Sequence, residues 1–138
     1  MGMEPFLINS CVSIVIGQRL VRKICTRCKE TYKPPKAMAE KLGLLDKKGE
    51  PLDLARGAGC RACFTSGYAG REVIAECLSM TPEIRELVLR RAPEREIQET
   101  ARKQGMKGLR EQGLAKVVAH ITTLDEIFRT TIGDMVEG

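Results

Sequence analysis

The sequence predicts an α+β protein in which helices predominate, and three observations lead to this class. The last third of the chain carries helix-start and helix-end residues at short intervals, which is typical of a small helical bundle. Residues 72–79 precede that part and contain the adjacent β-branched residues Val73 and Ile74, which favour a strand. Four cysteines in two close pairs lie in a glycine-rich middle, where short strands and turns are expected.

The first expected element is a helix over residues 5–16. Pro5 suits the first helical turn and Gly17 suits the end, and apolar side chains occupy nearly every position between them. A helix that is apolar around most of its circumference must be buried on several sides. Few partners precede it, so we expect the chain to be cut from a larger protein. Residues 19–25 alternate charged and apolar residues, and either a strand or a helix tail fits them.

The next part is expected to be mostly loop. Residues 25–35 contain two cysteines and end on the Pro34-Pro35 pair. Residues 36–44 fit a short helix, and residues 46–51 fit a polar turn.

Four helices are expected after residue 80. Thr81 can cap the first, with Pro82 at its first position. Pro93 opens a second helix that Gly105 ends. Thr123 and Glu126 have capping-box spacing before a short fourth helix. Apolar residues at helical spacing mark the third: Leu109, Leu114, Val117, Val118 and Ile121.

Cys25-Thr-Arg-Cys28 and Cys60-Arg-Ala-Cys63 are two Cys-x-x-Cys pairs separated by 31 residues. Two intervening residues let both thiolates of a pair face one ion from a tight turn, and two such turns complete a tetrahedral sulfur site. Soft thiolates favour zinc or an iron–sulfur cluster over magnesium or calcium. Four sulfurs leave no open coordination position, so the site would be structural. We therefore expect one structural Zn²⁺ per chain, bound by Cys25, Cys28, Cys60 and Cys63.

Two alternatives remain open for these thiols, namely disulfides or a redox dithiol, and an iron–sulfur cluster. Cys11 and Cys77 lie in apolar patterns without a Cys-x-x-Cys partner, and we expect them to be small core residues. His120 is the only histidine and is expected at a helix C-terminus rather than in catalysis. The acidic residues are expected on solvated helix faces.

The composition limits which partners and which cellular compartment are expected. Lys and Arg total 23 against 18 Asp and Glu, a formal net charge of +5, and the whole excess lies in residues 1–66. Nucleic-acid contact is one interpretation, but the absence of Trp argues against a stacking platform for single strands. We favour the interpretation that one basic run balances the negative charge of a zinc tetrathiolate. The run consists of Arg19, Arg22, Lys23, Arg27 and Lys29. No membrane span or secretory signal is visible, so a cytoplasmic location is expected.

Several stretches together carry a family resemblance. The run from Gly2 to Leu7 is followed by Gln18-Arg-Leu-Val-Arg22 and the first cysteine pair. The second pair begins a denser motif, Gly59-Cys60-x-x-Cys63-x-x-Ser66-Gly67-Tyr68-x-Gly70-Arg71-x-x-Ile74-x-Glu76. Arg102-Lys-Gln-Gly-Met106, Leu109-Arg110-x-x-Gly113 and Ile121-Thr-Thr-Leu-Asp-Glu126 follow. The chain thereby resembles the C-terminal region of the ATPases of type II secretion and type IV pilus assembly.

The resemblance implies the C-terminal part of a hexameric motor. Residues 1–24 would be the end of the ATPase core, residues 25–66 a tetracysteine zinc-binding subdomain, and residues 67–138 a strand followed by a C-terminal helical lobe. The expected fold is then α+β and mostly α, with short strands in the zinc-knuckle subdomain and a small helical bundle after it. No phosphate loop of the G-x-x-x-x-G-K-[ST] type occurs in the sequence, so ATP and Mg²⁺ would bind only in the parent chain. The fragment itself is not expected to be an enzyme.

The implied partners are neighbouring ATPase subunits and an inner-membrane platform protein, which would place the motor at the cytoplasmic side of that membrane. Nucleic acid is not an expected partner. Two alternatives remain from the residues alone. One is a zinc-ribbon-like nucleic-acid-binding protein, which the basic first half would favour. The other is a free-standing regulatory subunit, which would require a natural start at Met1.

Overall fold

The computed structural model describes residues 2–132 and has the α+β class that the sequence predicts. Its chain forms two compact units, Met1–Gln18 with Ala75–Leu109, and Arg19–Ile74 with Arg110–Gly138. We call the first the helical-hairpin unit. We call the second the cysteine unit, because it contains both Cys-x-x-Cys pairs.

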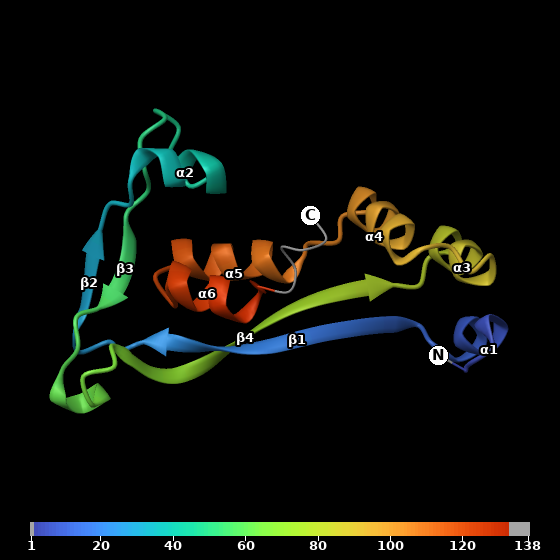
Figure 1. Cartoon of the computed structure of the whole chain (residues 1–138), viewed down its shortest axis with the longest axis horizontal. Coiled ribbons are helices and arrows are strands. Elements are labelled where there is room, and N and C mark those ends of the chain that lie inside the picture. The colour runs from blue at the N-terminus through green and yellow to red at the C-terminus, as the bar shows by residue number, and fades with distance from the viewer. Residues whose placement is uncertain (1, 133–138) are drawn as a thin grey trace. The chain divides into compact units, whose positions relative to one another are not determined.

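The helical-hairpin unit contains α1 (Pro5–Cys11), α3 (Pro82–Leu89) and α4 (Glu94–Lys103), which Figure 1 labels. Thr81 caps α3 as predicted, because its side chain accepts the N–H of Ile84 at 3.3 Å. The unit has one apolar core, and side chains of α1 and α4 pack against it. Its buried members are Met80, Ile84, Leu87 and Ala101.

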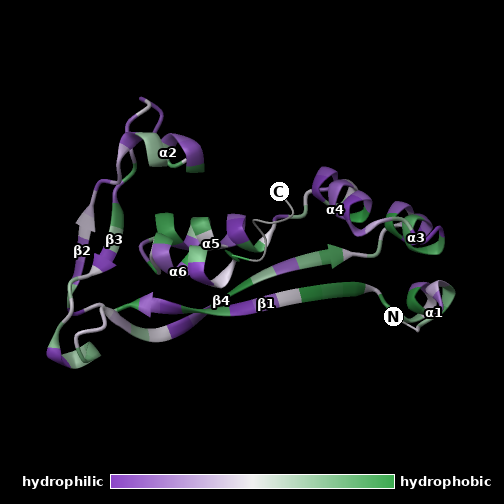
Figure 2. Cartoon of the chain, viewed as in Figure 1, coloured by the Kyte–Doolittle hydropathy of each residue, from purple (hydrophilic) through white to green (hydrophobic). Residues whose placement is uncertain are grey.

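The predicted helix over residues 5–16 is wrong beyond Cys11. Val12 is already extended, and β1 (Ile14–Ile24) begins two residues later. The first three residues of β1 are all apolar, so their spacing suits either element. Their β-branched side chains and pairing with β4 (Tyr68–Ser79) favour the strand. The expected burial is wrong as well, because α1 has no buried residue and Ile16 is 56% exposed. This exposed apolar stretch of β1 is green in Figure 2.

β1 and β4 are hydrogen-bonded neighbours in a two-stranded sheet. β4 confirms the strand predicted over residues 72–79 and begins four residues earlier. β1 settles the open choice at residues 19–25 in favour of a strand. Each of the two strands passes from one unit into the other.

A β-hairpin with a helix in its connection forms part of the cysteine unit. β2 (Lys29–Tyr32) pairs antiparallel with β3 (Leu54–Gly57), and Glu30 lies opposite Arg56. The prediction of a loop over residues 25–35 missed β2. The short helix and the polar turn are confirmed, as α2 (Lys36–Leu42) and the turn that the Leu45–Pro51 bridge closes.

α5 (Leu109–Val118) and α6 (Leu124–Thr130) complete the elements. Thr123 caps α6 as predicted, accepting the N–H of Glu126 at 3.2 Å. Gly113 lets α5 lie close to α6, since a Cβ there would be 2.7 Å from a methyl carbon of Ile127. Ile121, expected in the third helix, lies beyond its end. Among the described residues, no helix is both long and apolar enough to cross a membrane.

Candidate metal centre

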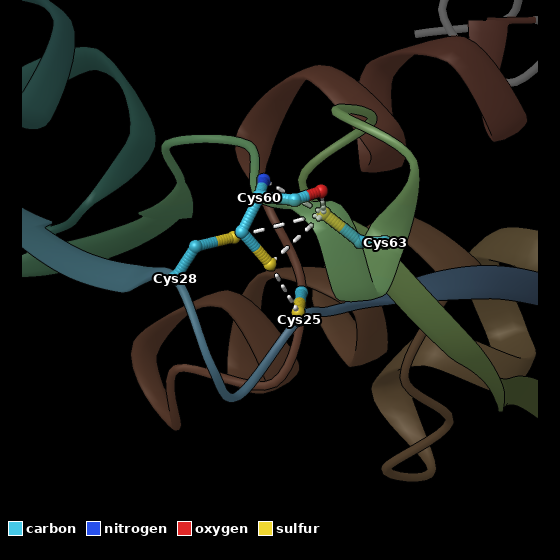
Figure 3. Close-up of side chains that lie close together, drawn as sticks. All are labelled: Cys25, Cys28, Cys60 and Cys63. Atoms are coloured by element: carbon cyan, nitrogen blue, oxygen red, sulfur yellow. Dashed lines mark hydrogen bonds between the residues drawn. The ribbon is translucent and has the colours of Figure 1, made fainter.

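The four predicted cysteines bring their side chains to one point in the cysteine unit (Figure 3). All four Sγ atoms lie within 4.8 Å of one another. The Sγ atoms are 3.8 Å apart in the Cys25–Cys60 and Cys28–Cys63 pairs and 3.7 Å apart in the Cys60–Cys63 pair. A tetrahedral ion with metal–sulfur bonds of ~2.3 Å has sulfur–sulfur edges of about 3.8 Å. These four thiols can therefore hold such an ion without large rearrangement.

Each cysteine pair lies in a turn between two strands. Cys25 directly follows β1, and Cys28 directly precedes β2. Cys60 and Cys63 belong to the 3₁₀ turn η1 (Arg61–Cys63) between β3 and β4, where Cys60 is the N-cap residue. The first pair therefore lies directly between the ends of two strands, and the second pair is positioned by the hydrogen-bonded turn η1.

Backbone contacts hold the two ends of the second turn together and join that turn to the first. A Cβ on Gly57 would lie 2.1 Å from the carbonyl oxygen of Gly67, and Gly67 itself has a φ of +83°. The Gly67 carbonyl accepts the N–H of Cys25 at 2.9 Å, and the Cys28 carbonyl accepts the N–H of Ala58 at 3.0 Å. Neither glycine can carry a side chain without moving the two ends of the second turn apart.

Backbone N–H groups donate to two of the four sulfurs. The Sγ of Cys63 accepts from Cys60 at 3.3 Å and from Gly67 at 3.2 Å. The Sγ of Cys28 accepts from Gly59 at 3.3 Å. Donors aimed at sulfur stabilise the thiolate, which is the form that binds metal.

Burial disfavours the charged form of these thiols, yet the pKa values of Cys63 and Cys28 move in opposite directions. At Cys63 the two N–H donors and the neighbouring thiols outweigh burial and lower the pKa to about 6. At Cys28 burial and the neighbouring thiols outweigh the single donor and raise the pKa to about 11. The thiolate of Cys63 is thus favoured at neutral pH, whereas the thiolate of Cys28 is disfavoured. A cation among the sulfurs would let all four ionise.

The other sulfur and imidazole groups lie elsewhere. The prediction that Cys11 and Cys77 are core residues is wrong, because both are exposed. Their neighbours Val12 and Leu78 pack against the apolar core, while the two cysteines themselves face solvent. His120 follows α5 with a φ of +63°, and its Nε2 lies 2.8 Å from the carbonyl oxygen of Asp53. Its ring therefore contacts the chain before β3 rather than the end of its own helix.

The sequence did not predict an ionic cluster that surrounds one buried carboxylate in the cysteine unit. Glu126, expected on a solvated face, is only 1% exposed. One carboxylate oxygen accepts the Arg22 backbone N–H at 2.6 Å and the Arg22 Nε at 3.0 Å, and the other accepts the Arg129 Nε at 2.8 Å. Burial opposes the charged form, but the arginine donors prevail and lower the pKa of Glu126 to about 2.

Tyr68 extends this cluster. The Arg22 guanidinium lies 4.2 Å from the centre of the Tyr68 ring, and the Tyr68 hydroxyl is 2.7 Å from the Thr123 Oγ. Arg22, which was assigned to counter-charge for the metal, therefore pairs with Glu126. The capping-box spacing marked Glu126 as a helix-start residue, but no local pattern marked its partner 104 residues earlier.

Comparison with known proteins gives a family match over most of the chain. The family model described as Type II/IV secretion system protein matches residues 1–129. That range includes both cysteine pairs and the Arg22–Glu126 cluster.

Individual relatives point the same way. The chain is 42% identical over 132 residues to the type IV pilus assembly ATPase PilB of Thermus thermophilus, covering 96% of this chain and 15% of that protein. It is 42% identical over 132 residues to the type II secretion system ATPase E of Vibrio cholerae, covering 95% and 25%. It is 37% identical over 131 residues to the type II secretion system protein E of Pseudomonas aeruginosa, covering 95% and 26%. The chain thus spans about a quarter or less of the length of these relatives.

Proposed function

The chain belongs to the Type II/IV secretion system protein family, and we propose that it is the zinc-binding C-terminal module of a hexameric ATPase motor. The motor would power type II protein secretion or type IV pilus assembly, as the names of the relatives suggest. The observation that carries the proposal is the set of four thiols whose Sγ atoms lie within 4.8 Å of one another inside the matched residues, from Cys25, Cys28, Cys60 and Cys63.

We infer that the ion is Zn²⁺. An all-thiolate tetrahedral set suits zinc, and four sulfur ligands leave no position for substrate or water. When bound, the ion would join the ends of β1, β2, β3 and β4 and neutralise part of the thiolate charge. Its role is therefore mechanical, because it would fix two backbone turns that carry few buried apolar side chains of their own.

ATP hydrolysis is assigned to the parent chain, with ATP and Mg²⁺ bound outside these residues. Residues 1–24 would end the ATPase core, residues 25–66 would form the zinc-binding subdomain, and residues 67–138 would form the strand and helical lobe. The partners would be neighbouring ATPase subunits and the inner-membrane platform protein. The module would then work in the cytoplasm, next to the inner membrane.

The test uses the full-length gene in a strain that lacks its own copy. The variant Cys63→Ser removes one ligand, and Cys77→Ser is the matched control because Cys77 is exposed and outside the cluster. We expect Cys63→Ser to lose stoichiometric zinc and to abolish secretion or piliation. Cys77→Ser should retain both one zinc per chain and normal output.

Two outcomes would contradict the proposal. A Cys63→Ser protein that accumulates and supports full output would show that the thiol cluster is dispensable. Normal output from a strain with no copy of the gene would show that the protein does not power the machine.

A further inference from the structure

An arginine–tyrosine stack adjoins both cysteine turns within the cysteine unit. Arg22 lies near the end of β1, and Cys25 directly follows that strand. Tyr68 is the first residue of β4, and Gly67 precedes it at the end of the second turn. The guanidinium of Arg22, 4.2 Å from the centre of the Tyr68 ring, therefore joins β1 and β4 at the ends nearest the cysteine turns.

Gly67 contacts both cysteine turns directly. Its N–H donates to the Sγ of Cys63 at 3.2 Å, and its carbonyl accepts the N–H of Cys25 at 2.9 Å. Because Tyr68 is bonded to Gly67, a shift of the tyrosine would displace a donor to one cysteine and an acceptor from the other. The position of the Tyr68 ring is therefore linked to the separation of Cys25 and Cys63.

Both members of the stack are fixed from the start of α6. Glu126, in the first turn of that helix, accepts the Arg22 backbone N–H at 2.6 Å and the Arg22 Nε at 3.0 Å. The Oγ of Thr123, the N-cap residue, lies 2.7 Å from the Tyr68 hydroxyl. Two residues at one helix start thus hold the guanidinium against the ring.

The segment before α6 also holds the backbone of β1 next to Cys25. The Ile24 N–H donates to the Ile121 carbonyl at 2.9 Å, and the Thr122 hydroxyl donates to the Arg22 carbonyl at 2.8 Å. Ile24 and Thr122 are both buried. The first cysteine turn therefore begins at a strand end that is fixed by residues before α6.

We propose that Arg22 and Tyr68 are positioning residues for the metal site. Their stack holds the two cysteine turns at the separation that four metal–sulfur bonds require, and it thereby sets the affinity for Zn²⁺. Groups outside the ligand shell orient the ligands of a metal, and loss of one costs about 10–100-fold in metal affinity. The proposal rests on the proposed zinc site and adds to it two residues that bind no metal themselves.

Simple counter-charge is the alternative role for Arg22. A lysine would supply the same charge near the thiolates, and that charge would act without the ring of Tyr68. Stacking requires a flat guanidinium and an aromatic face. The two roles therefore predict opposite results for Arg22→Lys and for removal of the ring.

The Zn²⁺ affinity of the purified 138-residue chain, measured by competition with a chromophoric chelator at pH 7, tests the positioning. Tyr68→Leu removes the ring, and we expect its affinity for Zn²⁺ to fall about 10–100-fold. Tyr68→Phe keeps the ring without the hydroxyl and should stay close to the wild-type value. Arg22→Lys is the milder change to the other member of the stack and should lose affinity several-fold.

Tyr32→Leu is the matched control. The Arg56 guanidinium lies 5.0 Å from the centre of the Tyr32 ring, so a stack of the same kind is lost. Tyr32 is at the end of β2 farther from Cys28, and its variant should keep the wild-type affinity. Co²⁺ in place of Zn²⁺ gives a spectroscopic readout of ligand geometry. Tyr68→Leu should keep the sulfur-to-cobalt band and shift the ligand-field bands, whereas Tyr32→Leu should change neither.

Several outcomes would overturn the proposal. Wild-type affinity in Tyr68→Leu would show that the ring does not position the site, and equal losses in Tyr68→Leu and Tyr32→Leu would indicate general destabilisation. A loss in Tyr68→Phe as large as in Tyr68→Leu would assign the effect to the hydroxyl. Unchanged affinity in Arg22→Lys would leave counter-charge as the role of Arg22. A wild-type chain that binds no Zn²⁺ would contradict the proposed function itself, and the positioning role would fall with it.

Discussion

The helical-hairpin unit and the cysteine unit are stabilised by different interactions. In the first, α3 and α4 bury one apolar cluster around Ile84 and Leu87. In the second, four thiols, a buried carboxylate with two arginines and a glycine–glycine contact hold turns that are polar in sequence. The cysteine unit also buries apolar side chains, among them Leu54, Ile74 and Ile127, but its two cysteine turns depend on these few polar groups. Substitutions at these few groups should therefore have large and local effects on the cysteine turns.

The largest expected effect is loss of the metal. Structural zinc of this kind supplies ~10 kcal/mol or more of folding free energy, and a two-stranded hairpin such as β2–β3 is marginal by itself. Chelation should therefore accelerate amide hydrogen exchange throughout residues 25–71. Exchange in α3 and α4 should stay slow, because their core contains no metal ligand. Equal loss of protection in both units would show that the metal does not stabilise the cysteine unit selectively.

Removing apolar packing should destabilise the helical-hairpin unit and spare the cysteine unit. Ile84 is fully buried, so Ile84→Ala should cost about 3 kcal/mol and accelerate exchange in residues 82–103. Zinc content should not change. Leu89→Ala is the control on the same helix, since Leu89 is 54% exposed and should cost much less. Loss of zinc from Ile84→Ala would mean that the two units are not stabilised separately.

The buried carboxylate of the cysteine unit makes a pH-dependent contribution. Glu126→Gln should cost about 2 kcal/mol at pH 7, because it removes the charge from hydrogen bonds to Arg22 and Arg129 whose guanidinium groups partly reach solvent. The pKa of Glu126 is about 2 in the fold, below the ordinary value of 4.5, so the contribution is complete above pH 4.5. It disappears as the pH falls toward 2.

The measurement is the stability difference between wild type and Glu126→Gln as a function of pH, from urea unfolding. Both proteins lose the metal at acid pH, so the effect of metal loss on stability cancels in the difference between them. It should be constant from pH 5 to 7 and shrink below pH 4.5. A difference that grows on acidification would contradict the assignment.

The smallest effects come from two helix caps with the same chemistry. Thr81→Ala should cost about 1 kcal/mol, the usual value for an N-cap. Thr123→Ala should cost about 1 kcal/mol more, because the Tyr68 hydroxyl also loses its partner. Tyr68→Phe should remove that excess when combined with Thr123→Ala. Equal costs for the two threonines would show that the Tyr68 hydrogen bond adds nothing.

Local patterns predicted the parts of the fold that local chemistry determines. Thr81 and Thr123 cap the helices that their sequence positions indicate. Two residues between cysteines define each metal-facing turn, and both turns meet as expected. Local patterns gave the wrong prediction where one pattern fits both a helix and a strand. Ile14, Val15 and Ile16 suit a helix or a strand, and pairing with β4 decided between them.

Features that depend on distant partners were not predictable. β2 and β3 have only four residues each and show no clear alternation, and their mutual pairing makes them strands. The burial of Glu126 depends on Arg22, more than 100 residues away. Cys11 and Cys77 have apolar neighbours in sequence, yet they lie on the surface, because one sequence pattern does not tell which face is covered.

X-ray absorption at the zinc edge of the purified 138-residue chain reports both the metal and its ligands. We expect one zinc per chain with four sulfur ligands at ~2.3 Å and no nitrogen or oxygen ligand. The Cys77→Ser protein should give the same spectrum, and Cys63→Ser should lose it. Iron in place of zinc, a mixed ligand set, or a folded chain without metal would contradict the account.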